Sequence, residues 1–185
     1  MITAVISRYG DRKREPQGCV IDKVGMNVYQ LVVEPGPRPF VFVETVTPNR
    51  VAVVDRGLTG LVFDIRTFNT LNGYHPGSDL KVRVYREGEP DLLSSIVLDE
   101  KGKVGGSGDS AAPTWRDGLK TIVQPRDPGS LVLVQAHGRT VQHLVVEQVE
   151  GKVSIETLIT RTPATPLETN IEIAVVRNLG PIRGR

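Results

Sequence analysis

Glycine and proline interrupt this chain so often that no stretch longer than about 13 residues is free of both. Proline removes a backbone hydrogen bond from a helix and glycine weakens a helix interior, so the spacing of these residues excludes long helices. The runs between the interruptions are short and rich in valine and isoleucine, which are enriched in strands. The sequence therefore predicts an all-β fold.

The apolar runs predict roughly ten strands. We expect strands at residues 3–9, 26–34, 40–47, 51–55, 80–87, 92–99, 130–136, 139–149, 152–160 and 170–177, with a short helix followed by a strand as the alternative for 92–99. Segment 80–87 alternates most clearly, with its aliphatic residues on one face and Lys81, Arg83 and Tyr85 on the other. Residues 61–71 favour a strand that runs into a short helical turn. Turn signals recur about every 8–12 residues, which indicates an antiparallel β-sandwich or barrel, with a jelly-roll-like arrangement as one alternative.

Three turns predict which of these strands pair with each other. Thr47–Arg50 has proline at its second position, as a type I turn prefers, and predicts a hairpin between residues 40–47 and 51–55. The pairs His137-Gly138 and Glu150-Gly151 predict tight turns within a meander of consecutive strands.

We expect one β-rich domain over residues 1–185, and no internal repeat is visible in the sequence. Three segments are longer than a tight turn requires: the proline-rich residues 35–39, the glycine-rich residues 100–118 and the basic tail 179–185. We predict a flexible loop or arm at 100–118 and extended arms at the termini, because loops of this length are usually functional or disordered.

Composition narrows the classes of function. The formal net charge of +2 is too small to suggest non-specific binding of nucleic acid, and no apolar run is long enough to cross a bilayer. The N-terminal residues lack the basic and long apolar regions of a signal peptide, so we expect a protein that is not secreted by that route. Cys19 is the lone cysteine and is expected to be a small buried hydrophobe.

Motifs that carry catalytic chemistry fail on inspection. Residues 108–113 (GDSAAP) resemble the segment around the nucleophile of trypsin-like serine proteases, but alanines replace two glycines, and His75, the one upstream histidine, is too near in sequence for that fold. His75, His137 and His143 show no metal-ligand spacing and are expected in turns or at the surface, with partial burial as the alternative for His143. We therefore predict no catalytic residue, no metal site and no cofactor, and a protein that is not an enzyme.

Seven residues are candidates for contacts with partner proteins. Trp115 and Arg116 follow the glycine-rich arm, and tryptophan and arginine dominate interface hot spots. The alternative for Trp115 is that it packs over the core of its own domain. The basic run near the N-terminus, the proline-rich loop and the tail contribute the others, which are Arg12, Lys13, Arg14, Arg38 and Arg183.

In general character this β-rich chain with arms and stiff loops resembles small virion proteins of tailed bacteriophages, such as capsid decoration proteins and tail or neck components. The resemblance implies a structural protein of the virion that stabilises subunit junctions through protein–protein contacts. Its partners would be copies of itself, as a homo-oligomer, and other virion proteins, with neither a membrane nor a specific nucleic acid involved. One alternative is a glycan- or small-ligand-binding β-sandwich such as the receptor-binding head of a fibre. A further alternative is an enzyme on a jelly-roll or barrel scaffold that brings the histidines together in space.

Overall fold

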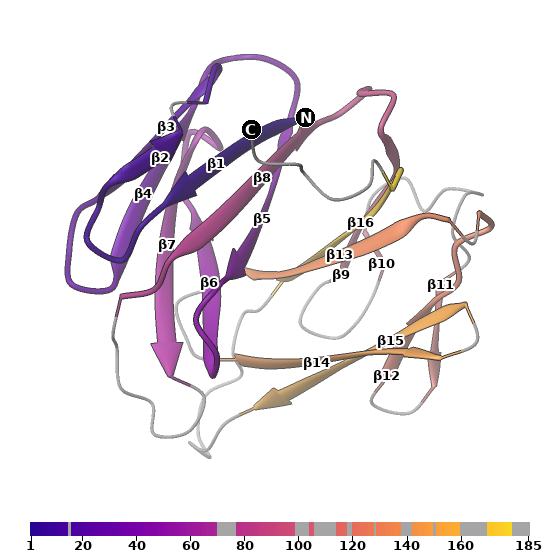
Figure 1. Ribbon diagram of the computed structural model, residues 1–185. Coiled ribbons are helices and arrows are strands. Elements are labelled where there is room, and N and C mark those ends of the chain that lie inside the picture. The colour runs from indigo at the N-terminus through magenta and orange to yellow at the C-terminus, as the bar shows by residue number, and fades with distance from the viewer. Residues whose placement is uncertain are drawn as a thin grey trace.

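The computed structural model describes residues 1–14, 16–69, 77–98, 104–105, 114–117, 120–127, 129–137, 142–149, 151–159 and 170–178 (Figure 1). The regular structure in these residues is all β-strand, which confirms the predicted all-β class. The strands form three sheets whose neighbours are almost all antiparallel. The sheets do not close into a barrel, so the barrel alternative is wrong.

The strands fall into two halves along the chain. The first half comprises β1 (Ile2–Ile6), β2 (Arg12–Arg14), β3 (Cys19–Lys23), β4 (Val28–Val33), β5 (Pro39–Thr45), β6 (Arg50–Arg56), β7 (Val62–Asn69) and β8 (Leu80–Arg86). The second half comprises β9 (Leu92–Leu98), β10 (Val104–Gly105), β11 (Thr114–Asp117), β12 (Lys120–Val123), β13 (Leu131–His137), β14 (Gln142–Val149), β15 (Lys152–Ile159) and β16 (Asn170–Val176).

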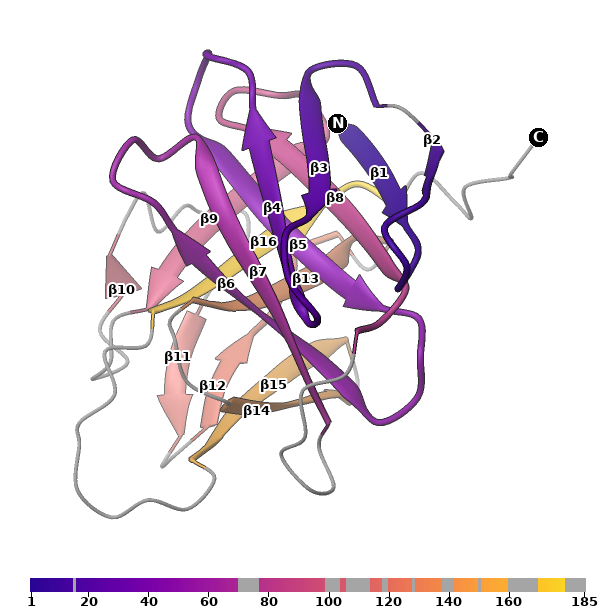
Figure 2. The same ribbon diagram turned by 90° about the vertical axis from the view of Figure 1, so that its left-hand side faces the viewer.

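Each half encloses its own core between two groups of strands. In the first half a four-stranded sheet, in the order β2-β1-β8-β5, faces strands β3-β4-β7-β6, which are one part of the eight-stranded sheet. We call the first group the first inner sheet and the second group the first outer sheet. The alternation predicted for 80–87 is confirmed, because Leu80, Val82 and Val84 point into this core and meet Leu31 of β4 and Phe63 of β7. In Figure 2 the outer sheet of the first half lies nearest the viewer, with β1, β8 and β5 behind it.

The second half repeats this arrangement with different side chains. Its inner sheet, in the order β10-β9-β16-β13, is the other part of the eight-stranded sheet. Its outer sheet is a separate four-stranded sheet in the order β11-β12-β15-β14. Ile96 and Ile173 from the inner sheet pack against Val123 and Ile155 from the outer sheet in a second buried core. The second outer sheet lies at the bottom of the view in Figure 2.

The two halves share one topology. Adding eight to every strand number of the first half reproduces the strand order of the second half in both sheets. The longest connection matches as well, since residues 70–79 join β7 to β8 and residues 160–169 join β15 to β16, ten residues in each case. No internal repeat is visible in the sequence, yet the structure repeats one strand order. The repeat lies in strand order and spacing, whereas sequences such as PFVFVET in β5 and LVLVQAH in β13 share only an apolar character.

The repeat makes residues of the two halves equivalent. Lys81 of β8 and Glu172 of β16 each lie between the first two core residues of their strand. Their cross-strand neighbours are Glu44 in β5 and Gln135 in β13, respectively. These positions point away from the core of their own half and toward the other half, so they determine how the halves meet.

The halves are joined where β6 and β13 lie side by side within one eight-stranded sheet. These two strands pair in parallel at a single position, Val54 with His137. The eight-stranded sheet therefore continues past β5, the edge strand of the first inner sheet, with β6 and its neighbours on one face of that inner sheet and β13 and its neighbours on the other. That inner sheet consequently has the first outer sheet on one face and the second inner sheet on the other.

Two predicted strand pairings are wrong for one reason. The turn at Thr47–Arg50 does not close a hairpin, because β5 pairs with β8 while β6 pairs with β7. The turn after His137 likewise leads from β13, which pairs with β16, to β14, which pairs with β15. Each of these short connections carries the chain from one sheet to the facing one. The hairpin at Glu150-Gly151 is confirmed by the pairing of β14 with β15.

The remaining differences concern short elements. The segment after residue 61 is strand throughout β7, and residues 70–71, where the helical turn was predicted, lie outside the described residues. The residues between the strands expected at 3–9 and 26–34 contain two short strands, β2 and β3. The arm predicted at 100–118 contains β10 and β11, and its other residues lie outside the described parts of the chain.

Candidate functional site

The apolar part of the seam between the halves is a third buried cluster. Phe40 and Phe42 of β5 and Tyr85 of β8 pack against Ala174 and Val176 of β16. The rings of Phe42 and Tyr85 meet edge to face, with centroids 6.3 Å apart and an interplanar angle of 71°. Because these side chains are removed from water only when the halves are together, their burial favours one fixed arrangement of the two halves.

A buried carboxylate, Glu172 of β16, lies at the same seam and binds two arginines of the first half. Its Oε1 is 2.9 Å from Nη2 of Arg56 and 3.2 Å from Nη2 of Arg38, and its Oε2 is 3.0 Å from Nε2 of His137. The Arg56 guanidinium also donates a hydrogen bond of 2.9 Å to the carbonyl of Pro39. The Glu172 side chain is only 5% exposed, so the pairs it makes are shielded from water. We call these four side chains the Glu172 cluster.

The electrostatics of the Glu172 cluster are set by burial and by neighbouring cations. Burial alone raises the pKa of Glu172, but the hydrogen bond to His137 and the charges of His137, Arg56 and Arg38 outweigh it, and the pKa lies below its ordinary value. Burial lowers the pKa of Arg56, an effect that Glu172 opposes. The cluster therefore joins Glu172 of the second half to Arg38 and Arg56 of the first half.

Gln135 of β13 fastens the edge of β5 to the eight-stranded sheet. Its Oε1 accepts a hydrogen bond of 2.9 Å from the backbone N–H of Val43. Its Nε2 donates to the carbonyls of Ala52, at 3.2 Å, and Ala136, at 2.9 Å. Gln135 is buried, so this side chain takes the place of a neighbouring strand at that point of the β5 edge.

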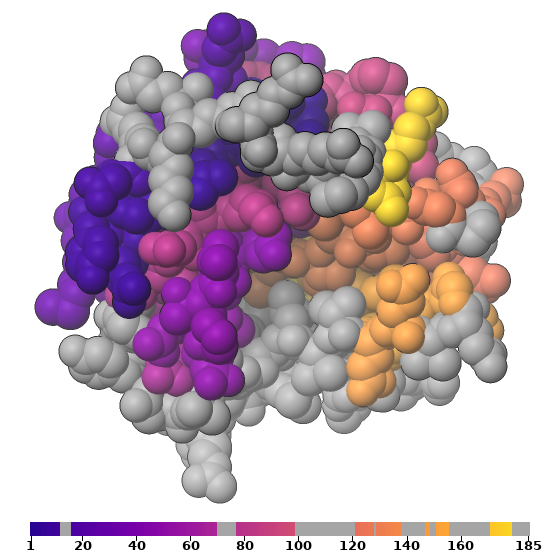
Figure 3. All heavy atoms as spheres, viewed as in Figure 1, coloured from indigo at the N-terminus to yellow at the C-terminus, as the bar shows by residue number. Residues whose placement is uncertain are grey.

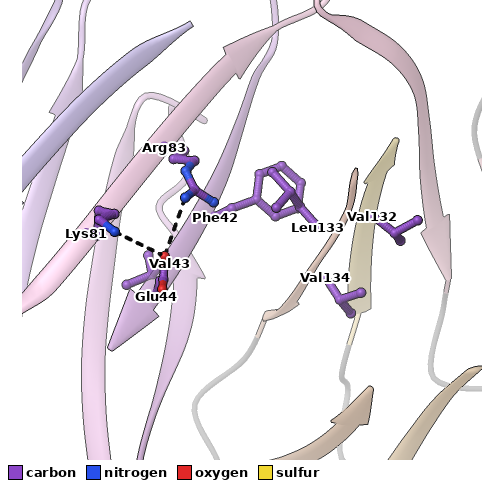
Figure 4. A pocket seen from close by; sticks show the side chains of 8 residues that line it. All are labelled: Phe42, Val43, Glu44, Lys81, Arg83, Val132, Leu133 and Val134. Carbon is purple, nitrogen blue, oxygen red and sulfur yellow. Dashed lines mark hydrogen bonds and ion pairs between the residues drawn. The ribbon is translucent and has the colours of Figure 1, made fainter. Parts of the chain in front are cut away.

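Beyond Gln135 the two inner sheets separate and leave a groove of about 250 Å³. Three consecutive residues of β5, namely 42–44, and three of β13, namely 132–134, line it together with Lys81 and Arg83 of β8. Phe42 and Leu133 point toward each other across the floor in Figure 4. Figure 3 shows the two halves meeting on the face that Figure 1 views.

One wall of the groove is charged and the rest is apolar. Oε2 of Glu44 is 3.5 Å from Nη2 of Arg83 and 3.8 Å from Nζ of Lys81, as the dashed lines in Figure 4 mark. The Glu44 side chain is 55% exposed, so these are weak surface pairs. Two cations facing one carboxylate leave the wall with a net positive charge. The groove therefore suits an anionic group attached to an apolar one.

The structure places the predicted interface residues apart. Arg38 belongs to the Glu172 cluster, where its guanidinium also lies 5.0 Å from the ring centroid of Phe40. The basic residues 12–14 form β2, an edge strand of the first inner sheet. Trp115 and Arg116 lie in β11, an edge strand of the second outer sheet. Arg183 lies outside the described residues.

The prediction that His137 lies in a turn or at the surface is wrong. It is the last residue of β13 and is buried against Glu172. His75 lies outside the described residues, and His143 lies in β14. Cys19 is buried, as predicted, and burial raises the pKa of its thiol to about 11, with a smaller contribution from Glu34.

Sequence reasoning did not single out Glu172, Arg56 or Gln135. Glu172 and Gln135 are polar residues within the strands expected at 170–177 and 130–136, and Arg56 directly follows the strand expected at 51–55. The signal that could have identified two of them is the apolar sequence on both sides. Glu172 lies within NIEIAVV and Gln135 within LVLVQAH, and apart from the terminal residues of these strands all of their other side chains are apolar. A single polar residue in such a run indicates a buried partner.

Within the described parts of the chain, no three histidine, cysteine, aspartate or glutamate side chains lie close enough together to hold a metal ion. A search of the same residues finds no helix with the length and apolar character needed to cross a membrane. No family model matches the sequence, and neither the curated proteins nor the solved structures provide a significant match.

Proposed function

We propose that this chain is a structural protein that works through protein–protein contacts, with copies of itself and with other proteins of a larger assembly. The narrower form of the proposal is a bacteriophage virion component, either a capsid decoration or cement protein or a part of the tail or neck. The two cores and the buried seam support the proposal. They hold the two halves in one fixed arrangement, and several sheet edges remain at the ends of the sheets.

The observation that carries the proposal is the edge at β3. This strand ends the eight-stranded sheet, and no other described strand pairs with its outer side. Val20 on β3 and its cross-strand neighbour Val32 on β4 are 47% and 41% exposed, and Val24 and Met26 at the turn of the same hairpin are more exposed still. A strand that ends a sheet beside exposed apolar side chains is the type of surface on which another chain adds a strand.

The test is self-association and partner binding by a variant of this edge. Val20→Lys introduces a charge on the exposed face of β3, and Val46→Lys makes the same change at a residue that is 57% exposed in the turn between β5 and β6. We expect the molar mass in solution, measured by sedimentation over a range of protein concentrations, to fall for Val20→Lys and not for Val46→Lys. A chain that is monomeric at every concentration and co-sediments with no phage particle would contradict the proposal.

The groove favours the second candidate function, the binding of a glycan or another small ligand. Its volume of about 250 Å³ lies below the usual range for sites that enclose a whole small molecule, about 300–1,000 Å³. Glycan-array binding that is lost on Arg83→Gln, which changes the charged wall of the groove, would favour this alternative over assembly. The enzyme alternative requires the histidines to act together, and among the described side chains His137 is committed to Glu172.

A further inference from the structure

The groove between the inner sheets runs along two strand edges. Successive side chains of a strand point to opposite faces, so a groove that is lined by residues 132, 133 and 134 together must follow the edge of β13. The same holds for residues 42–44 of β5. The two edges differ, however, in whether their backbone groups already have partners.

The edge of β5 is closed by side chains. Gln135 accepts from the N–H of Val43, and Arg56 donates to the carbonyl of Pro39. A partner strand placed against β5 would have to displace both, and Arg56 would then lose a contact within the Glu172 cluster. The edge of β5 is therefore a poor place for a further strand.

Over the groove, none of the described strands pairs with the edge of β13. The carbonyl of Ala136 points toward β6, because the Gln135 amide that reaches Ala52 of β6 donates to it as well. In an antiparallel strand alternate residues direct both N–H and C=O to the same side. Val134 and Val132 therefore present their backbone groups on this side, where no described strand pairs with β13 except at His137.

We propose that an extended segment of a partner protein adds to this edge of β13, carrying an apolar residue and an acidic residue two positions apart. The backbone groups of Val132 and Val134 would pair with the segment. Its apolar side chain would lie on Phe42 and Leu133, and its carboxylate would meet Lys81 and Arg83. Residues two apart in a strand share one face, which matches an apolar floor beside a cationic wall. This inference rests on the proposed function and names the partner chemistry of one of its surfaces.

Charge complementarity selects this occupant over the chain's own basic tail. Residues 177–185 contain three arginines and no aspartate or glutamate, so they would repel Lys81 and Arg83. The volume of the groove, about 250 Å³, fits an anchoring side chain with its neighbouring carboxylate rather than a whole cofactor.

The probe is a fluorescein-labelled hexapeptide of threonine with one valine and one glutamate two residues apart. Binding to the full chain is measured by anisotropy and by the shifts of the Val132 and Val134 amide signals in NMR spectra. Two control peptides carry lysine in place of glutamate, or N-methyl groups on the edge that would pair with β13. We expect both controls to bind at least about tenfold more weakly, since each removes a charge-assisted or a backbone hydrogen bond.

Three variants test the wall of the groove. Arg83→Gln is expected to weaken the glutamate peptide about fivefold to tenfold, whereas Arg177→Gln, which removes an exposed arginine outside the groove, leaves it unchanged. Glu44→Gln removes the carboxylate that competes for both cations and is expected to tighten binding about twofold to fivefold. Damage to the fold cannot produce a gain in affinity, so this variant separates the groove from an unstable protein.

The proposal is overturned if no peptide binds, if the N-methylated peptide binds as well as the parent, or if Glu44→Gln gives no gain. Equal competition by acetate or phosphate would identify a small anion as the occupant and overturn strand addition. A dimer that Arg83→Gln dissociates would place a second copy in the groove and overturn the choice of partner. Assembly through the β3 edge that Arg83→Gln leaves intact, with no peptide bound, would retain the proposed function and remove only this inference.

Discussion

The substitution Glu172→Gln tests whether the buried charges hold the two halves together. Glutamine keeps the shape of the side chain but leaves Arg56 and Arg38 without a counter-charge. Removing one partner of a buried ion pair typically costs about 3–5 kcal/mol. The Arg38 and Arg56 side chains remain 43% and 25% exposed and recover part of their hydration. We therefore expect a loss of about 2–3 kcal/mol in the free energy of unfolding.

The chain supplies a matched control in Glu44→Gln. Glu44 also lies near two cations of a β-strand, but it is 55% exposed where the Glu172 side chain is 5% exposed. An exposed pair contributes about 0–1 kcal/mol, so this variant should unfold close to the unaltered protein. In a chain of this length a loss of about 2–3 kcal/mol lowers Tm by about 4–12 °C, which differential scanning calorimetry resolves easily. The reasoning is refuted if the two variants lose equal stability.

Acidity provides the second measurement on the same residue. The pKa of Glu172 is lowered in the folded state, so its stabilising contribution is present above its pKa in the unfolded chain and is lost as pH falls through the folded pKa. The stability difference between the unaltered protein and Glu172→Gln should therefore be full near neutral pH and shrink in acid below about pH 4. Urea titrations at a series of pH values measure it, and a difference that grows in acid would contradict the assignment.

Three further predictions concern single residues. Tyr29→Phe should cost about 1–3 kcal/mol by urea denaturation, because the buried hydroxyl donates to the carbonyl of Ser78 at 2.8 Å and accepts from its N–H at 3.1 Å; a neutral result would refute this. Cys19, with its pKa raised by burial to about 11, should react slowly with a disulfide reagent at pH 8 and rapidly in denaturant, and equal rates would show that the thiol is accessible. Asn49 has a φ of 56°, so Asn49→Val should cost about 1–2 kcal/mol and Asn49→Gly little, and thermal unfolding that ranks them in the reverse order would exclude strain at this turn.

Local patterns in the sequence predicted most of the longer strands, although not β3 or β12, because a strand is a local structure. Segment 80–87 shows this best, since its period of two identified both the face that enters the first core and the face that leaves it. Pairing is not local. The four residues between β5 and β6 suit a hairpin and a passage between facing sheets equally well, and only the destination of each strand decides between the two.

The candidate site could not be predicted from the sequence, because the face of each inner sheet that points away from its own core packs against the other half instead of facing water. Lys81, Arg83 and Tyr85 were placed correctly on one face of a strand, yet nothing in the sequence reveals that Tyr85 is buried while Arg83 lines a groove. Glu172 is the extreme case, as a charge that reads as surface in sequence lies at the centre of a seam. These errors share a cause, which is that a sequence pattern reports alternation and not what covers each side.

The repeated topology gives this chain a freedom that a pair of identical subunits lacks. In a two-fold symmetric dimer each surface is used twice, so any residue that helps on one side appears on the other as well. Here the equivalent positions Lys81 and Glu172 hold opposite charges, and of their cross-strand neighbours Glu44 is charged while Gln135 is neutral. Lys81 and Glu44 line a groove at the surface, whereas Glu172 and Gln135 are buried and hold the two halves together. Because the two halves are covalently linked and differ in sequence, equivalent positions can serve different purposes. Those of the second half stabilise the contact between the halves, and those of the first half remain available to bind a partner.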